Sequence, residues 1–216
     1  MTLHRTVTLL GLALGLLGLG LQFALTMPQF AAEVGWGLGL VRFLTFFTIL
    51  TNLMLVLIYA SELSGSALLG WWRSPVTRAM MAAAMLLVML FYHVMLAPSL
   101  HFEGGMQVAT VILHYIAPSL YIGFWLVYAR HGALTMWHVL PMMVPPALYL
   151  AWVLLRGSWV GEYPYEVLNV AELGANAVIN NVSALIFLFM VLAGIAVTVD
   201  RRIAAGGRSA QTVHHA

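Results

Sequence analysis

The chain has 216 residues, of which 62% are hydrophobic and only 7% are charged, and its mean hydropathy is +0.96. Soluble domains carry about 25% charged residues, so this composition excludes a soluble globular protein. The net charge of +2 is too small and too scattered to indicate a nucleic-acid partner. The chain has no cysteine, which excludes disulfides and thiolate chemistry.

Six apolar segments follow one another, each of about the 20 residues that a helix needs to cross a membrane. None alternates apolar and polar residues with a period of two, and backbone groups in lipid must pair within the protein, so helices are favoured over a barrel. The first segment is longer than the apolar part of a secretory signal, and no clear cleavage site follows it, so we expect it to be retained. The predicted helices span residues 7–26, 40–60, 77–97, 107–129, 137–155 and 175–199.

We therefore predict an all-α, polytopic membrane bundle that forms a single six-helix transmembrane domain over residues 1–200. A polar tail over residues 201–216 is expected to be disordered and cytoplasmic. If the N-terminus is cytoplasmic, only Arg42 and Arg156 of the nine basic residues lie outside. The positive-inside rule thus predicts an integral membrane protein with both termini in the cytoplasm. The basic residues on that side are Arg5, Arg73, Arg78, Arg130, Arg201, Arg202 and Arg208.

Polar side chains inside the predicted spans gather at one depth, in the half of the bundle that faces outward. Polar groups in hydrocarbon are costly, so their gathering at one depth predicts a functional site. Two structural readings compete with it: threonines in membrane helices often bond their own i−4 carbonyl, and asparagines often join helices. The residues are Thr45, Thr48 and Asn52 on one face of the second helix, His93 and His114 on the third and fourth, and Asn180 and Asn181 on the last.

A hydroxyl and an imidazole at the same depth suit nucleophilic catalysis, in which the histidine takes the proton of the hydroxyl. Thr45 or Thr48 would be the nucleophile and His114 the base. No carboxylate lies within the spans to complete a triad. Two histidines, His93 and His114, also permit haem or metal ligation, so a non-enzymatic haem-, metal- or lipid-binding protein is the alternative. For the hydrolase no cofactor is expected.

Three stretches carry a family resemblance: Arg42 to Asn52, Leu113 to Pro118 with Trp125 downstream, and Glu162 to Asn169. They resemble motifs of a bacterial membrane family known as Pr6Pr, over the second to sixth predicted helices. That family is distantly similar to the androgen-induced and androgen-dependent TFPI-regulating proteins. Those are six-helix intramembrane threonine hydrolases of fatty acid esters of hydroxy fatty acids.

The resemblance implies a lipid-ester hydrolase in a bacterial cytoplasmic membrane. Its threonine nucleophile falls on Thr45, with Thr48 as the competing candidate one turn away. Its histidine falls on His114, and its late-helix asparagine falls near Asn181.

The expected mechanism and substrate contacts follow from these assignments. Asn181 or His93 would donate to the oxyanion, with Asn180 and Asn52 in support. Arg42, at the outer mouth, would bind a lipid carboxylate, although an arginine there could equally snorkel to the interface. Tyr121 and Trp125 would contact the lipid substrate, which enters from the bilayer. The oligomeric state is not predicted.

Overall fold

The computed structural model describes the backbone of residues 2–213 and the side chains of residues 2–207, and the described residues form helices and no strand. Six helical spans are long and apolar enough to cross a membrane, which confirms the predicted membrane bundle. The spans are Leu3–Phe43, Phe47–Ser64, Pro75–Leu96, Gly104–Tyr128, Met136–Val160 and Ala175–Gly207.

Several spans combine an α-helix with a shorter helical turn of another type. The α-helices are α1 (Leu3–Phe43), α2 (Phe47–Ser64), α3 (Pro75–Phe91), α4 (Gly104–Val111), α5 (Ala117–Tyr128), α6 (Val139–Val160), α7 (Val170–Leu173) and α8 (Ala175–Val213). The 3₁₀ turns are η1 (Ala67–Arg73), η4 (Met136–His138) and η5 (Glu166–Leu168), and the π-helical turns are η2 (Tyr92–Leu96) and η3 (Ile112–Ile116).

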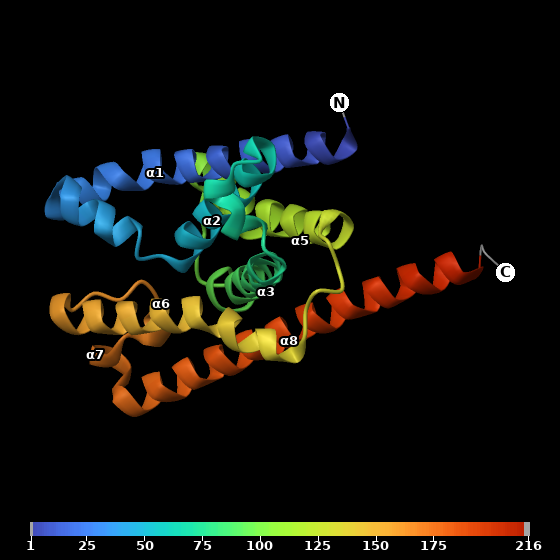
Figure 1. The fold of residues 1–216 in the computed structure, drawn as a ribbon. Coiled ribbons are helices and arrows are strands. Elements are labelled where there is room, and N and C mark those ends of the chain that lie inside the picture. Colours follow the sequence, from blue (N-terminus) through green and yellow to red (C-terminus); the bar gives the residue numbers. More distant parts are fainter. Residues whose placement is uncertain (1, 214–216) are drawn as a thin grey trace.

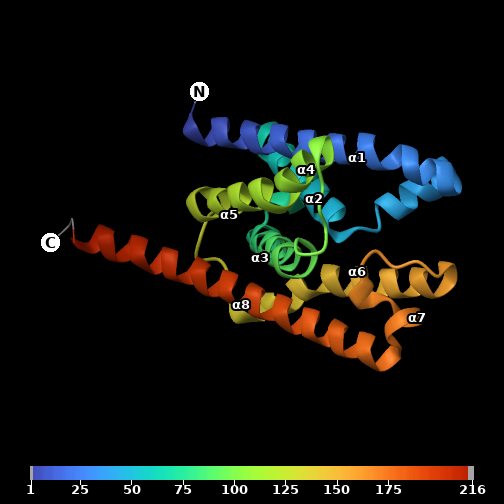
Figure 2. The same ribbon diagram turned by 180° about the vertical axis from the view of Figure 1, so that it is seen from behind.

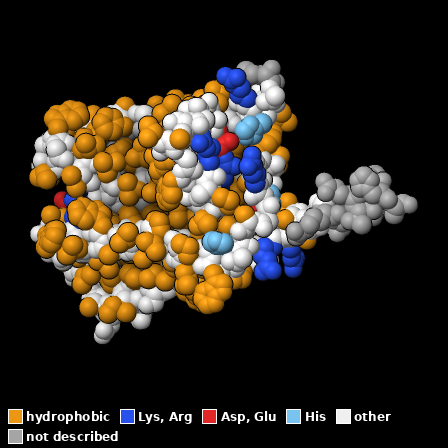
Figure 3. Space-filling view, viewed as in Figure 1, with side chains coloured by type: hydrophobic (Ala, Val, Ile, Leu, Met, Phe, Trp, Pro, Cys, Tyr) orange, Lys and Arg blue, Asp and Glu red, His pale blue; other side chains and the backbone are white. Residues whose placement is uncertain are grey.

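Helix α3 lies at the centre of the bundle, with α1, α2, α4 and α5 on one side and α6 and α8 on the other (Figures 1 and 2). Its residues from Ala79 to Met85 are all buried, because alanines allow close approach and methionines fill irregular gaps. The first turn of α1 and the last turns of α8 lie at the same end, here called the N-terminal end (Figure 1). The visible surface away from that end is mostly apolar (Figure 3), as a lipid-facing surface requires.

The second span begins at Phe47, so the predicted start at residue 40 is wrong. Gly35 adopts φ 80° and ψ 161°, a backbone conformation that glycine reaches without strain, and interrupts α1. The chain then folds back on itself, so that a Cβ placed on Gly39 would lie 3.2 Å from the backbone of Phe30. Residues 44–46 separate this short returning segment from α2. A break therefore stands where the sequence predicts a continuous helix.

The end of the chain also differs from its prediction, because α8 continues to Val213 where a disordered tail is expected. Three alanines and three arginines among residues 201–213 favour helix. The prediction for residues 214–216 lies outside the described residues.

Glycines of α1 bring it against its neighbours, and one of them gives a stability prediction. A Cβ on Gly11 would lie 2.3 Å from the ring of Tyr59, whereas one on Gly20 would meet nothing within 4 Å. We expect Gly11→Ala to lower the melting temperature in detergent, with a loss of about 1–3 kcal/mol from overpacking, and Gly20→Ala to leave it unchanged. Equal melting temperatures for the two variants would refute this packing of α1 on α2.

Candidate active site

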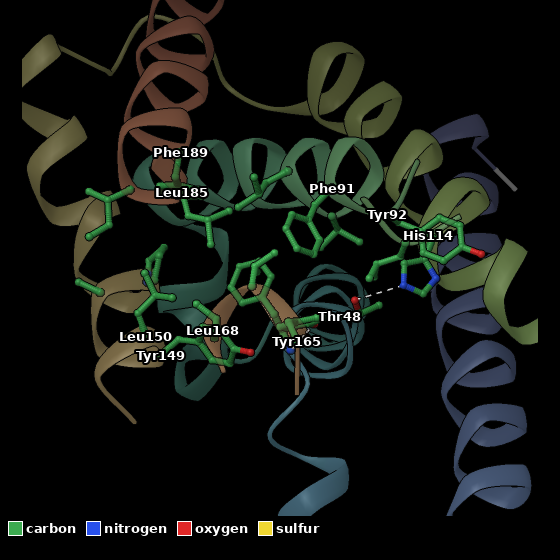
Figure 4. Close-up of a pocket in the computed structure, with 18 of the residues that line it drawn as sticks. Thr48, Phe91, Tyr92, His114, Tyr149, Leu150, Tyr165, Leu168, Leu185 and Phe189 are labelled. Atoms are coloured by element: carbon green, nitrogen blue, oxygen red, sulfur yellow. Dashed lines mark hydrogen bonds between the residues drawn. The ribbon is translucent and has the colours of Figure 1, made fainter. Parts of the chain in front are cut away.

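The Thr48 hydroxyl and the His114 imidazole face each other where α2 meets the π-helical turn η3. Thr48 Oγ1 lies 3.3 Å from His114 Nε2 (Figure 4). The other ring nitrogen, Nδ1, lies 3.0 Å from the carbonyl oxygen of Thr110. A carbonyl only accepts, so Nδ1 carries the proton of the neutral ring and Nε2 accepts from Thr48. The pair thus has the arrangement of a hydroxyl nucleophile and its general base.

Two π-helical turns meet at this pair. Turn η3 carries His114, turn η2 carries Tyr92, and the two rings lie 4.1 Å apart between centroids at an interplanar angle of 30°. In η3 the amide of Ala117 bonds the carbonyl of Ile112, five residues earlier. Such turns widen a helix locally and are frequent at functional sites. The stacking of Tyr92 on His114 fixes the plane of the imidazole.

The break before α2 creates a helix N-terminus beside the Thr48 hydroxyl. Thr48 is the second residue of α2, and the amides of Ile49 and Leu50 that follow it donate to the carbonyl of Phe46. The phenol oxygen of Tyr165 accepts a hydrogen bond of 3.1 Å from the amide of Phe47. The positive end of the helix dipole therefore lies where an oxyanion would form on attack by Thr48.

Tyr165 is the main site residue that the sequence analysis does not single out. Desolvation raises the pKa of its phenol, and hydrogen bonds to Thr48, Phe47 and Tyr149 act in the opposite direction. The phenol stays protonated at neutral pH and has a hydrogen to donate beside Thr48 (Figure 4). Its position in the loop before α8 explains the omission, since the sequence gives a depth in the membrane only for residues within the spans.

Asn52 joins the two halves of the site. Its side-chain amide donates to the carbonyl of Thr48 at 2.8 Å and to the carbonyl of Leu113 at 3.2 Å, and the residue is fully buried. Leu113 precedes His114, so this one amide sets the distance between nucleophile and base. Asn52 is thus a positioning residue, one turn below Thr48 on the same helix.

We expect Asn52→Leu to lower ester turnover about tenfold or more, because loss of one well-placed support shifts the reacting groups. The melting temperature should fall as well, since two carbonyls lose a donor. Asn180→Leu is the matched control, since Asn180 is exposed. Turnover and melting temperature measured on both variants check this, and an Asn52→Leu protein as active as Asn180→Leu would refute the positioning role.

Two pockets meet at Thr48 and His114. The first, here called the apolar pocket, has a volume of about 70 Å³ and lies among α2, α3, α6 and α8, with Phe91, Leu150, Leu168 and Phe189 in its wall (Figure 4). The second, the mixed pocket, has a volume of about 180 Å³ and lies between α1, α2 and α4. The residues that line both are Thr48, Tyr92, Leu96, His114 and Tyr165.

The mixed pocket contains polar groups that the apolar pocket lacks. Gln22 and Thr26 of α1 and Thr110 of α4 line it, and Gln22 donates to the Thr26 hydroxyl at 2.8 Å. Leu100 and Phe102, in the loop before α4, lie at its margin and are exposed. Gln22 and Thr26 are about 30 Å along α1 from its first residue, so the site lies away from the N-terminal end.

Thr45 occupies a different position from the one predicted. It lies in the break between α1 and α2, is 1% exposed, and is not among the residues that line either pocket. Its hydroxyl donates to the carbonyl of Val41, four residues earlier, at 2.7 Å, and its carbonyl accepts from Tyr149. The bond to Val41 is the structural role that threonines often have in membrane helices. The predicted common face of Thr45, Thr48 and Asn52 is wrong, because helix geometry begins only at Phe47.

The structure does not bring His93 together with His114. His93 is exposed, its Nδ1 lies 3.1 Å from the Tyr115 hydroxyl, and it is not among the residues that line the two pockets. The π-helical turn η2 directs Tyr92 to the site and its neighbour His93 away from it. No group of three or more metal-binding side chains occurs among the described residues.

The asparagines of α8 also lie apart from the reacting pair. Asn181 donates to the carbonyl of Val167 at 2.9 Å, and Asn180 is exposed. The expected donation from Asn181 to an oxyanion therefore finds no support in the geometry. Its bond instead holds the loop that carries Tyr165.

Arg42, expected at the mouth of the site, is held by two carboxylates. It pairs with Glu33 and, at 3.5 Å, with Glu162, and its guanidinium lies 4.5 Å from the centre of the Phe30 ring. Glu162 also pairs with Arg156. This network fastens the returning segment of α1 to the loop after α6. The Arg42 guanidinium is therefore already paired with carboxylates of the protein.

Tyr121 and Trp125 lie too far along their helix to reach the site. They follow His114 by seven and eleven residues, or about 10 Å and 16 Å of helix rise. The Tyr121 hydroxyl donates to the carbonyl of Arg78, and Trp125 packs on His131. Both residues are buried near the N-terminal end, where they support the core.

Comparison with known proteins adds no assignment: no protein-family model, no curated protein and no solved structure matches the chain. The fold and the site together define a six-helix integral membrane protein with a partly buried Thr48–His114 pair between two pockets.

Proposed function

We propose that the protein is an intramembrane hydrolase of lipid esters, with Thr48 as the nucleophile and His114 as the general base. The observation that carries the proposal is the hydrogen bond from Thr48 to His114 Nε2, with Nδ1 held by the Thr110 carbonyl. Backbone carbonyls are uncommon in this role, but they fix the tautomer as a carboxylate does. This supports Thr48 rather than Thr45, to which the resemblance points.

In the first step Thr48 Oγ attacks the ester carbonyl while its proton moves to His114 Nε2. The tetrahedral oxyanion collapses, and the leaving alkoxide takes that proton and departs as an alcohol. Water then attacks the acyl-threonine with His114 again as base, releasing the fatty acid and restoring Thr48. No cofactor takes part.

The oxyanion would be stabilised by two features of the same corner of the site. The positive end of the α2 dipole and the protonated Tyr165 phenol both lie beside Thr48. Donors held in place before the reaction are effective because they need no reorganisation when charge develops.

The two pockets suit an ester with a chain on either side of the carbonyl. The apolar pocket would take the first methylene groups of the acyl chain, and its small volume requires the remainder to extend into the bilayer. Ile186, on its lining, is 38% exposed, which supports lateral entry from lipid. The polar side of the mixed pocket would take the leaving alcohol and the attacking water. A fatty acid ester of a hydroxy fatty acid has this form.

We place the protein in a bacterial cytoplasmic membrane, with both termini in the cytoplasm and the site in the outer half of the bilayer. The excess of arginine at the N-terminal end supports this orientation.

The test is turnover of fluorogenic esters by the purified protein in detergent. We expect hydrolysis of a long-chain ester and much slower hydrolysis of the acetyl ester, since the acyl chain supplies binding energy through the apolar pocket. Absence of turnover for every chain length, together with a haem absorption band in the purified protein, would favour the cofactor-binding alternative.

A separate prediction concerns Tyr165. We expect Tyr165→Phe to lower kcat about a hundredfold with little change in KM, because removal of one oxyanion donor acts on the transition state. Tyr163→Phe is the matched control, because the Tyr163 ring packs against Gly157 and the residue is not among those lining the two pockets. A rise in KM with unchanged kcat would instead assign Tyr165 to substrate binding.

A further inference from the structure

A third cavity, independent of the proposed active site, lies at the N-terminal end of the bundle. It has a volume of about 480 Å³ and is formed by α1, α2, η1, α3, α5 and α8. Arginine and histidine side chains gather at this end of the molecule (Figure 3). The charged and titratable residues that line this Arg-lined cavity are His4, Glu62, Arg73, Arg78, Arg130 and Asp200.

Both carboxylates of the cavity already have partners. Asp200 is 1% exposed and accepts from the backbone amides of Gly132 and Leu134 at 2.9 and 3.2 Å. It also pairs with His131 at 3.1 Å. The other carboxylate, Glu62, pairs with Arg78. Neither carboxylate therefore pairs with Arg73 or Arg130, and three arginines against two carboxylates leave the cavity with a net positive charge.

The arginines retain unused charge and donor capacity. Arg73 donates to the carbonyls of Ser61 and Ser66, which are neutral acceptors. Within residues 2–207, neither Arg73 nor Arg130 pairs with a carboxylate. Arg78 is 8% exposed, and its Nε is buried without a hydrogen-bond partner. Three guanidinium groups from three elements thus line one cavity that holds two committed carboxylates.

The element beside the cavity has the features of a membrane-interface segment. In η1, Leu68 is 94% exposed and Trp71 is 57% exposed, although both are apolar or amphipathic. Tryptophan favours the headgroup region, so these side chains would lie at the boundary between headgroups and acyl chains. Arg73, at the end of the same turn, then lies at the level of lipid phosphates.

From this charge and depth we infer that the Arg-lined cavity binds a phosphate-bearing anion, with the headgroup of an anionic phospholipid from the adjacent leaflet as the favoured source. Guanidinium groups bind phosphate oxygens through paired N–H donors. Arg73 and Arg130 would supply the unpaired charge and the donors. The volume accommodates a phosphate and part of its glycerol.

The test is native mass spectrometry of the purified full chain, titrated with phosphatidylglycerol or with phosphatidylcholine. We expect one phosphatidylglycerol to bind more tightly than phosphatidylcholine. Arg130→Gln and Arg73→Gln should each bind it about fivefold more weakly, the worth of one arginine near a lipid surface. Arg5→Gln, an exposed arginine at the same end that does not line the cavity, is the control and should bind as the wild type does.

Competition with inorganic phosphate distinguishes the two sources of the anion. Displacement of the lipid by millimolar phosphate, lost in Arg130→Gln, would identify a site that also takes free phosphate. Equal binding of the two lipids without any effect of phosphate would overturn the inference. So would equal losses in Arg5→Gln and Arg130→Gln, because general surface charge would then explain the binding. Arg130 is exposed and has no ion pair within residues 2–207, so its variant should fold.

Discussion

Thr48→Ala is expected to abolish hydrolysis of a long-chain ester, with a fall in kcat of about a thousandfold or more. The hydroxyl is the only atom of the residue that reaches His114 Nε2. Without it, attack must come from water that nothing positions. The loss should appear in kcat and kcat/KM together, because the substrate pockets are left in place.

Thr45→Ala is the control for this prediction, since it removes the same atoms three residues earlier in the chain. Its hydroxyl bonds Val41 and lies outside both pockets. We expect near-normal turnover and a small fall in stability of about 1 kcal/mol, the usual value of one such bond. The reverse pattern, with Thr45→Ala inactive and Thr48→Ala active, would show that the residue implied by the family resemblance is the nucleophile.

His114→Ala is expected to lower kcat by a similar factor, because an unactivated threonine is a weak nucleophile. Nucleophile and base act as a unit, so the double variant Thr48→Ala/His114→Ala should be no slower than either single variant. Kinetics of the three proteins on one ester measure this.

His93→Ala is the matched control for the histidine. His93 is exposed and bonds Tyr115, so its variant should retain turnover. Multiplicative losses in the double variant would show that Thr48 and His114 act separately, which contradicts the proposed pair.

The sequence predicts the six spans well because hydropathy over about 20 residues is a strong signal. It does not predict the break before α2, since the chain from Gly35 to Phe47 is apolar apart from Arg42 and Thr45, and glycine is common in membrane helices. The returning segment of α1 therefore reads as the beginning of the second span. The resulting early start of the second helix also puts Thr45 and Thr48 on one helical face in the prediction.

The sequence predicts only part of the candidate site. Depth along a helix is simple to estimate, so Thr48, Asn52 and His114 are placed together. The direction in which a side chain points around its helix is harder to estimate, because the π-helical turns η2 and η3 shift the faces of His93 and His114. Tyr165 lies in a loop, and the contact of its phenol with the amide of Phe47 joins residues 118 positions apart. Such a contact depends on the whole fold.

The most direct test of the central claim is the mass spectrum of the protein after reaction with a long-chain alkyl fluorophosphonate, which traps an activated hydroxyl covalently. We expect a single adduct on the peptide that contains Thr48, retained in Thr45→Ala and lost in Thr48→Ala and in His114→Ala. An adduct that persists in Thr48→Ala would contradict it.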